Sequence, residues 1–482
     1  MDAKQESSGE IYSADRSLEY IFHPNSIAVV GVSAGNSFFN AGLRYIQILA
    51  WAGFKGSLFG INPQGSEVPG FKIYTNVKEI PEDVDYVISA IPVKFTPELM
   101  RDCVVKGVKV IQFFTSGFGE IEDVRGKQIE EEILGIAHGS SLRIIGPNCL
   151  GLYCSETGLS FSPEFPQRSG DFAFMGQSGG NSVHCVTEAA NREIYFSKVI
   201  SFGNAIDLNE SDFLYYLAND PKTKVIGVYL EGVKDGKSFA GVLREATLKK
   251  PVIVLKSGST DAGIRAAASH TSAIAGSNAI WQSMLNQVNA IQVSSIGELV
   301  DVASIFLQVP PIAGRRTLVV GLGGGASVVA ADDCTRAGLI VPSLPSKSRL
   351  ELENICGSEI GGSFRNPIDL YRVDLLQQVV EKAYSKNEFD ILLAHMPFEL
   401  YGLVTDDLKD VVVKMFCQSL INLRGSEYSP HVVVLHGYST AKARQRAMEA
   451  HAMLCEAGFA VFETVERAAR AINKVIQYYR QP

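Results

Sequence analysis

The sequence predicts an α/β fold with mainly parallel sheets, divided into three domains. From residue 26 onward, short runs of valine, isoleucine and other apolar residues alternate with amphipathic helical patterns. This alternation is typical of strand–helix–strand units with right-handed crossovers, which build parallel sheets. The length of 482 residues fits three domains of about 150 residues each.

Composition and charge exclude several classes of function. Apolar residues make up 46% of the chain and charged residues 20%, as in ordinary soluble proteins. The net charge of −8 disfavours nucleic acid as a partner, because contacts with its phosphates require a basic surface. No apolar run reaches the ~18 residues of a membrane span, and the N-terminus shows no signal-peptide pattern. We therefore expect a cytoplasmic protein without a membrane or nucleic-acid partner.

The cysteines give no sign of a metal site. All eight are scattered without a Cys-x-x-Cys pair, and no His-x-x-x-His lies nearby. We therefore expect neither a zinc site nor a disulfide framework.

Residues 20–150 are predicted to form a Rossmann-like domain after a flexible tail at residues 1–19. A buried strand at Ser26–Val32 enters a turn, and a helix starts at Ala41. The other predicted elements are strands at Ser57–Ile61, Asp85–Ile91, Val108–Phe114 and Leu142–Ile145, and helices at Pro97–Lys106 and Lys127–His138. The first turn lacks a G-x-G-x-x-G pattern, and Asn62-Pro63 stands where an acidic residue would hold a dinucleotide ribose. A nicotinamide-dependent dehydrogenase is therefore disfavoured.

Five short motifs stand at the predicted carboxyl ends of these strands. They read Gly31-Val32-Ser33, Asn62-Pro63, Ile91-Pro92, Thr115-Ser116-Gly117-Phe118 and Gly146-Pro147-Asn148-Cys149-Leu150-Gly151. Ligands of open α/β sheets bind at this edge, where small residues let backbone N–H groups approach phosphates. Each motif alone is equally compatible with a simple turn, but the five together favour a ligand site.

Residues 151–312 are predicted to form a second domain, with a flavodoxin-like sheet. Five strands are expected, at Phe172–Met175, Lys198–Phe202, Val225–Leu230, Val252–Lys256 and Ala290–Val293. The first strand leads through Gln177, Ser178, Gly179 and Gly180 to a helix at Ser182–Asn191. Because a helix N-terminus offers unpaired N–H groups and a partial positive charge, this turn can hold a phosphate.

One histidine, His270, stands on an open loop of small residues after the fourth strand of this domain. Glu231 ends the third strand, so both side chains emerge at one edge of the predicted sheet. A carboxylate that accepts a hydrogen bond from one ring nitrogen fixes the tautomer and leaves the other nitrogen as a nucleophile. The alternatives are a histidine that packs near a helix end and a glutamate exposed at a strand end. The residues by themselves leave both open.

Residues 313–482 are predicted to form a third α/β domain of the same class. Pro310-Pro311 mark the linker before it, since two prolines cannot continue a helix. A strand from Leu318 runs into Gly323, Gly324, Gly325 and Ala326, and a helix follows at Ser327–Ala337. This helix start is a second candidate anion site, although a tight turn would also explain the glycines. Further strands are expected at Phe389–Ala394, Val432–His436 and Phe459–Phe462.

Several of these motifs resemble those of the NDP-forming acyl-CoA synthetases, the superfamily that includes succinyl-CoA synthetase. Residues 269–276, Ser-His-Thr-Ser-Ala-Ile-Ala-Gly, resemble the family's phosphohistidine loop and differ from it at Ser272, where glycine is usual. The five strand-end motifs resemble those of the family's CoA-binding domain. The segment Tyr229–Gly236 resembles the motif that carries its histidine-orienting glutamate, and Asn366–Leu370 resembles a motif of its phosphate-gripping domain.

The resemblance implies which residues bind which ligand. CoA would be held by Gly31, Ser33, Asn62, Pro63, Ile91, Pro92, Ser116, Gly117, Phe118 and Asn148. Phosphate would be held by Gln177, Ser178, Gly179, Gly180, Gly323, Gly324, Gly325 and Ala326. His270 would carry the phosphoryl group and Glu231 would orient its ring, and no residue is assigned to a metal.

The resemblance also implies a reaction and a partner. The chain would be the α subunit of an ADP-forming acyl-CoA (acetyl-CoA) synthetase, an acid–thiol ligase. It would interconvert acyl-CoA, ADP and phosphate with carboxylic acid, ATP and CoA. No segment is left for the ATP-grasp module of this superfamily, so a separate β subunit would carry ADP or ATP with Mg²⁺, in an α2β2 assembly. The alternative is a CoA-binding regulatory protein without catalysis, which the presence of both Glu231 and His270 disfavours.

Overall fold

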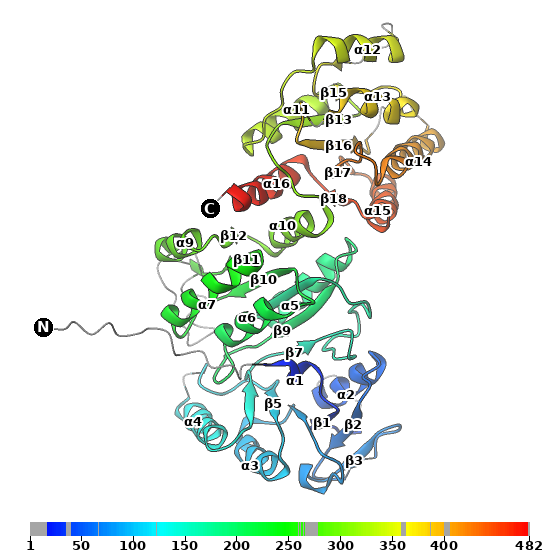
Figure 1. Ribbon diagram of the computed structural model, residues 1–482. Helices are drawn as coiled ribbons and strands as arrows, with labels where there is room; N and C mark the ends of the chain where they lie inside the picture. Colours follow the sequence, from blue (N-terminus) through cyan, green and yellow to red (C-terminus); the bar gives the residue numbers. More distant parts are fainter. Residues whose placement is uncertain are drawn as a thin grey trace, which may run out of the picture. The chain divides into compact units, whose positions relative to one another are not determined.

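The computed structural model describes residues 17–480 except 35–39, 66, 122, 259, 261, 264, 266–277, 358–362, 386 and 400–404. The described residues form three six-stranded sheets that follow one another along the chain and alternate with helices (Figure 1). The predicted α/β architecture is therefore confirmed.

The first sheet is parallel throughout and has the strand order β3-β2-β1-β4-β5-β6, which is that of a Rossmann fold. Its strands are β1 (Ser26–Val30), β2 (Ser57–Ile61), β3 (Lys72–Tyr74), β4 (Tyr86–Ser89), β5 (Val110–Phe113) and β6 (Arg143–Ile145). The helices of this segment are α1 (Glu19–Phe22), α2 (Ala41–Trp51), α3 (Thr96–Lys106) and α4 (Val124–His138). Strand β3 is missing from the prediction, because Lys72, Ile73 and Tyr74 do not form an apolar run and none of them is buried.

The second sheet has the order β12-β11-β10-β8-β9-β7. Without β7 this is the flavodoxin-like order, so the predicted class is confirmed. Its strands are β7 (Gly151–Tyr153), β8 (Phe172–Gly176), β9 (Phe196–Ser201), β10 (Val225–Leu230), β11 (Val252–Lys256) and β12 (Ile291–Val293). The helices are α5 (Gly179–Ala190), α6 (Glu210–Asn219), α7 (Gly236–Lys249) and α9 (Asn278–Gln287). The unpredicted β7 pairs antiparallel with β9 at the edge.

The third sheet has the order β14-β15-β13-β16-β17-β18, again flavodoxin-like apart from the antiparallel edge strand β14. Its strands are β13 (Thr317–Gly321), β14 (Ser363–Phe364), β15 (Ile368–Asp369), β16 (Ile391–Pro397), β17 (Val432–His436) and β18 (Ala460–Phe462). The helices are α10 (Ile296–Gln308), α11 (Gly324–Arg336), α12 (Ser346–Cys356), α13 (Leu376–Ala383), α14 (Asp406–Leu423), α15 (Ala441–Glu456) and α16 (Val465–Arg480). The two-residue strands β14 and β15 are missing from the prediction.

Burial explains why the central strands are continuous apolar runs. All five residues of β1 and all six of β10 are buried, as expected for parallel strands covered on both faces. Full burial of each valine, leucine or isoleucine contributes roughly 1.5–3 kcal/mol relative to exposure. The sheets are therefore rigid supports for the turns at their edges.

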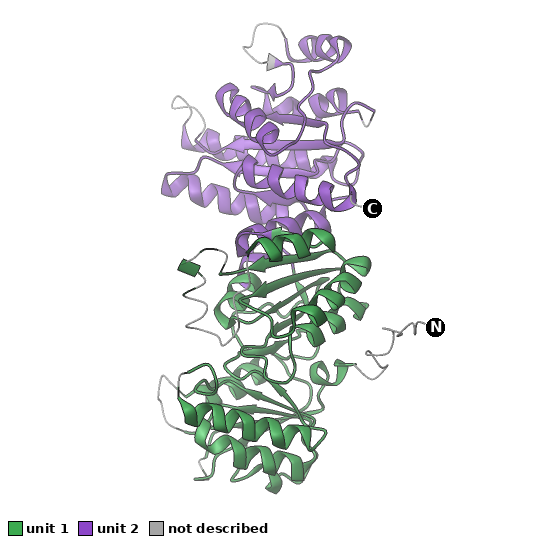
Figure 2. Cartoon of the chain, turned by 90° about the vertical axis from the view of Figure 1, so that its left-hand side faces the viewer, with its two compact units in different colours: residues 1–186, 195–292 green, residues 187–194, 293–482 purple. Residues whose placement is uncertain are grey.

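The three sheets occupy two compact units (Figure 2). Unit 1 comprises residues 1–186 and 195–292, with the first sheet and the second sheet up to Gln292. Unit 2 comprises residues 187–194 and 293–482, with the third sheet.

Two general properties of the described residues bear on function. All eight cysteines are free and buried. Burial raises the pKa of Cys103 and of Cys149 well above the ordinary thiol value, so both behave as small apolar core residues. None of the helices in the described part of the chain has both the length and the apolar content needed to cross a membrane.

A buried ion pair joins β9 to the residue after α6 in unit 1. The Lys198 amine donates to an Asp220 carboxylate oxygen 2.9 Å away, and the two side chains are 1% and 2% exposed. The hydroxyl of Thr223 donates to the same carboxylate. Burial by itself raises the pKa of Asp220, but the hydrogen bonds from Lys198 and Thr223 outweigh it and the net pKa is lowered.

We expect Lys198→Met to destabilise unit 1 by about 3–5 kcal/mol, because it leaves the Asp220 carboxylate buried without its cation. The matched control is Lys222→Met. Lys222 pairs with Glu156 at the surface, where the side chains are 47% and 40% exposed, so its loss should cost less than about 1 kcal/mol. Urea unfolding measures both variants. A Lys198→Met loss as small as that of the control would contradict this account.

Candidate active site

A cavity of about 540 Å³ lies in unit 1, at the carboxyl edge of the first sheet. Its walls come from the ends of β4 and β5, from the segment after β6, and from the first residues of α2 and α5. The lining residues are Ala41, Ala90, Ile91, Pro92, Phe114, Thr115, Ser116, Asn148, Cys149, Leu150, Gly179 and Gly180. These elements meet because the carboxyl ends of parallel strands share one edge. The cavity therefore lies between this edge and the N-terminus of α5, the helix that follows β8 of the second sheet.

Residues predicted for two different ligands line this cavity together. From the CoA set they are Ile91, Pro92, Ser116 and Asn148, and from the phosphate set Gly179 and Gly180. Asn148 has a φ of +58°, and its N–H donates to the carbonyl of Thr115 over 3.1 Å. A Cβ on Gly179 would lie 2.7 Å from Cγ of Leu150. Only glycine therefore lets the start of α5 approach the cavity wall so closely.

The remaining residues of the first two CoA motifs shape the turns after β1 and β2. They are Gly31, Ser33, Asn62 and Pro63, and none of them lines the cavity. Gly31 has a φ of +98°, and a Cβ there would lie 2.7 Å from the carbonyl oxygen of Ala90. The side chain of Asn62 donates to the carbonyl of Val32 over 2.8 Å, which ties the two turns together. Pro63 is exposed.

The motif after β5 holds its own backbone in place. One carboxylate, that of Glu120, accepts hydrogen bonds from the N–H groups of both Gly117 and Phe118. The ring of Phe118 is fully buried in the core of the first sheet, with its centroid 5.8 Å from that of Phe113. The structure thus gives the Phe118 side chain a packing role where the motif predicts a ligand contact.

The turn between β8 and α5 is fixed by the side chain of Gln177. Its amide oxygen accepts the backbone N–H groups of Glu231, at 2.6 Å, and of Gly232, at 3.2 Å. Its amide nitrogen donates to the carbonyl of Gly232 over 3.1 Å. Next to it, the hydroxyl of Ser178 accepts the N–H of Asn181 over 3.3 Å and caps the first turn. The predicted phosphate-binding turn and the predicted orienting glutamate therefore form one hydrogen-bonded assembly.

Glu231 is 8% exposed and lies among polar neighbours. The Tyr229 hydroxyl donates to Oε1 of Glu231 over 3.3 Å, and the buried amine of Lys256 donates to the Glu231 carbonyl over 2.9 Å. Burial lowers the pKa of Lys256, while the Glu231 carboxylate opposes this shift. For the Tyr229 hydroxyl, which is neutral when protonated, burial has the opposite effect and raises the pKa. A partly desolvated carboxylate, on a backbone held by Gln177 and Lys256, is suited to orienting an imidazole ring.

The predicted nucleophile His270 lies outside the described residues, together with residues 266–277 around it. The strand before this segment, β11, runs parallel to β10, with Lys256 opposite Leu230. Strand β11 therefore ends at the sheet edge that carries Glu231.

The second predicted phosphate site belongs to unit 2, where α11 begins. Gly323 precedes the helix with a φ of +90°, and residues 324–326 begin its first turn. The hydroxyl of Ser327 lies 3.2 Å from Nε2 of His395, and Nδ1 of this buried ring lies 3.3 Å from Nε2 of His436. Two strands, β16 and β17, therefore hold the first turn of α11 in place.

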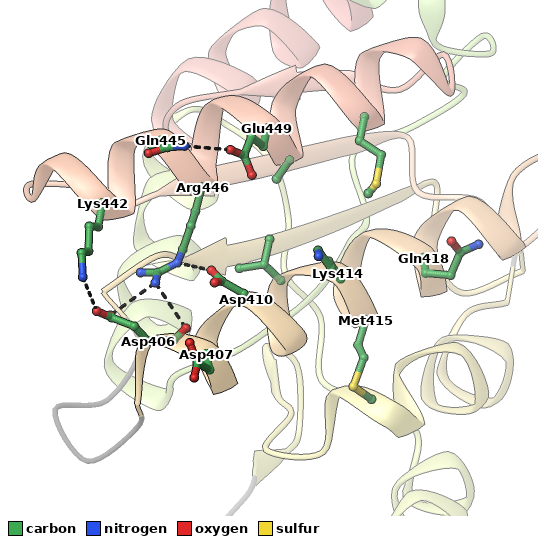
Figure 3. A pocket seen from close by; sticks show the side chains of 13 residues that line it. Asp406, Asp407, Asp410, Lys414, Met415, Gln418, Lys442, Gln445, Arg446 and Glu449 are labelled. Atoms are coloured by element: carbon green, nitrogen blue, oxygen red, sulfur yellow. Dashed lines mark hydrogen bonds and ion pairs between the residues drawn. The ribbon is translucent and has the colours of Figure 1, made fainter.

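A second cavity, of about 840 Å³, lies between α14 and α15 in unit 2 (Figure 3). Figure 3 shows Lys442 and Arg446 of α15 directed toward Asp406 and Asp410 of α14. The Lys442 amine lies 2.9 Å from an Asp406 oxygen. These charges are neutralised by one another, and no predicted site residue lines this groove.

Two family models match this chain. A CoA binding domain matches residues 25–155, and a succinyl-CoA ligase like flavodoxin domain matches residues 169–306. The α subunit of ADP-forming acetate–CoA ligase I from Pyrococcus furiosus is 31% identical over 96% of this chain and 98% of its own. The α subunit of ligase II from the same organism is 37% identical over 73% of this chain and 76% of its own. This chain belongs to the ADP-forming acetate–CoA ligase family.

A solved structure agrees with this assignment. It is the acetyl-coenzyme A synthetase 1 of Ca. Korarchaeum cryptofilum, in complex with phosphate and ADP. The TM-score is 0.81 at 31% sequence identity, and the match covers 96% of this chain and 97% of that one. The family predicted from the sequence motifs is confirmed.

Sequence reasoning misses several residues that line the cavity. They are Ala41, Ala90, Phe114, Thr115, Cys149 and Leu150. Thr115, Cys149 and Leu150 lie within motifs that the sequence shows, but a motif does not reveal which of its side chains face a ligand. Ala41 starts the helix after the first motif. Its position depends on the tertiary fold.

Gly180→Leu should weaken binding of CoA by roughly tenfold or more, because a branched side chain would enter the cavity and displace the ligand. The backbone tolerates the change, since nothing lies within 4 Å of a Cβ at this position. Gly241→Leu on α7 is the matched control, because a Cβ there also has nothing within 4 Å. Calorimetric titration of each chain with CoA gives the affinities. Equal affinities for the two variants would show that this cavity does not hold CoA.

Proposed function

We propose that this chain is the α subunit of an ADP-forming acyl-CoA ligase that acts on small acyl-CoA substrates such as acetyl-CoA. The observation that carries the proposal is the shared cavity, because residues predicted for CoA and residues predicted for phosphate line it together. The two reactants of the first chemical step would meet there. The names of the Pyrococcus furiosus relatives support the same activity.

In the first step, a phosphate oxygen would attack the thioester carbonyl carbon. The C–S bond breaks, CoA leaves as the thiolate, and an acyl phosphate forms. Backbone N–H groups at the start of α5 would hold the phosphate, since Gly179 and Gly180 place no side chain between the helix and the cavity. Fixed dipoles that face the developing negative charge provide the main stabilisation in such a site.

In the second step, a ring nitrogen of His270 would attack the phosphorus atom. The bond between phosphorus and the acyl oxygen breaks, and the carboxylate leaves. Glu231 would accept a hydrogen bond from the other ring nitrogen and stabilise the phosphorylated ring. Gln177 and Lys256, which hold the Glu231 backbone, would act as positioning residues.

The second half of the reaction would need a partner. We propose that an ATP-grasp β subunit binds ADP with Mg²⁺ and takes the phosphoryl group from His270, in an α2β2 enzyme of the cytoplasm. The relatives are named as α subunits, which supports a β partner. Within this chain, residues 20–150 would bind CoA, residues 151–312 would carry the phosphohistidine, and residues 313–482 would grip phosphate.

Glu231→Gln should lower the rate of phosphohistidine formation by roughly 10²-fold or more, because the ring loses a charged partner. The chain is incubated with acyl-CoA and labelled phosphate and then treated with acid or base, since phosphohistidine is acid-labile and base-stable. His270→Ala should carry no such label. Glu245→Gln, an exposed change on α7, should behave as wild type. Equal labelling of His270→Ala and the wild type would refute the assignment of the nucleophile.

The highly purified chain should form no ATP from acyl-CoA, ADP and phosphate, and addition of a purified ATP-grasp β subunit should restore turnover. The reason is that every residue assigned here serves CoA, phosphate or the phosphohistidine, and none serves the nucleotide. A coupled ATP assay with and without the β subunit measures this. Steady ATP formation by the chain alone would contradict the proposal that the nucleotide binds to a separate β subunit.

A further inference from the structure

A buried carboxyl group occupies the start of α11 in unit 2. Asp369 ends β15 and is 7% exposed. It accepts a hydrogen bond from the N–H of Gly323, and its Oδ2 lies 3.0 Å from the position of a Cβ on Gly324. Its Oδ1 is buried and has no hydrogen-bond partner among the described residues. A carboxyl group with an unused acceptor therefore lies at the N-terminus of a helix of 13 residues.

The second sheet of the same topology lacks this feature. Strands β8 and β13 both end in glycine. After each of them, a helix whose first residue is glycine begins three residues later. The glycine of β8 pairs in register with Ser201 and Tyr229, whereas the glycine of β13 pairs with Asp369 and His395. The start of α5 thus has a neutral hydroxyl where the start of α11 has an acid.

The surroundings of Asp369 provide no buried cation among the described residues. The elements that pack against β15 are β13, β14 and α11, and neither these strands nor the first turn of α11 carry a titratable side chain. The other titratable groups around it are His395 on β16, Asp332, Asp333 and Arg336 further along α11, and the exposed Arg365, Tyr371 and Arg372 beside β15. Arg372 pairs with Asp374. Burial lowers the pKa of His395 to about 3, so this ring is neutral.

Two anions at this helix start would repel each other. An ionised Asp369 and a phosphoryl dianion would share the N–H groups of one turn, and like charges so close cannot both persist without a cation. Burial already raises the pKa of Asp369, and only the N–H of Gly323 opposes this shift. A protonated carboxyl group, in contrast, could donate from Oδ1 to a phosphoryl oxygen.

We propose that Asp369 couples phosphoryl binding at the start of α11 to the uptake of one proton. The ionised carboxylate repels anions and so weakens their binding at the N-terminus of α11. With a proton from solvent on Oδ1, Asp369 becomes a hydrogen-bond donor that positions the phosphoryl group, and the proton returns to solvent when the group leaves. This inference rests on the proposed phosphate-gripping function of this helix start.

The test uses sulfate, a tetrahedral dianion that does not titrate near neutral pH, with the full chain. Asp369→Asn keeps an acceptor for Gly323 and removes the charge, so it should bind sulfate about tenfold more tightly above neutral pH. Its affinity should also depend much less on pH than that of the wild type, which should rise as the pH falls. Asp332→Asn removes the same charge from an exposed position on α11 and is the matched control. It should behave as wild type.

Difference infrared spectroscopy gives a second reading, whose main signal comes from the wild type. Addition of sulfate to the wild type should produce the carbonyl band of one protonated carboxyl group, and Asp369→Asn should lack this band. If sulfate binds equally to the wild type and Asp369→Asn, and no such band appears, Asp369 only caps α11 and this inference is wrong. If no chain binds sulfate at this helix start, the proposed phosphate site fails as well.

Discussion

The side-chain amide of Gln177 connects the two strand ends on which the proposed site depends. Its oxygen accepts N–H groups from the turn that carries Glu231, and its nitrogen donates back to that turn. The residues that follow Gln177 form the start of α5 and line the cavity. An amide can both donate and accept without bearing a charge. It therefore fixes this turn without adding a charge beside the proposed phosphate site.

The turn from a strand that ends in glycine to a helix start occurs twice in the fold, with different side chains beside it. In each flavodoxin-like sheet, the first strand ends in glycine and a helix begins a few residues later. At α5 the flanking strand ends with Ser201, which is neutral. At α11 the flanking strand ends with Asp369, which is an acid. The difference lies in one side chain at one register position.

The sequence predicts the class of each sheet because long apolar runs such as β10 show their period and their burial directly. It does not predict β3, whose residues are not buried, or β15, which has only two residues. The site is predicted where motifs lie at strand ends, as with Gly179 at the start of α5. The contact between Asp369 and the start of α11 depends on strand register, which local sequence does not specify. The ring of Phe118, a motif residue, packs in the core, and its motif does not indicate this.

The central claim is that CoA, bound at the carboxyl edge of the first sheet, also contacts the N-terminus of α5, which follows β8 of the second sheet. Hydrogen–deuterium exchange of the full chain, with and without CoA, tests this directly. The account predicts slower exchange at 114–116 and 148–150 and, at the same CoA concentration, at 179–181 at the start of α5. Slower exchange confined to the first sheet, with 179–181 unchanged at saturating CoA, would contradict it.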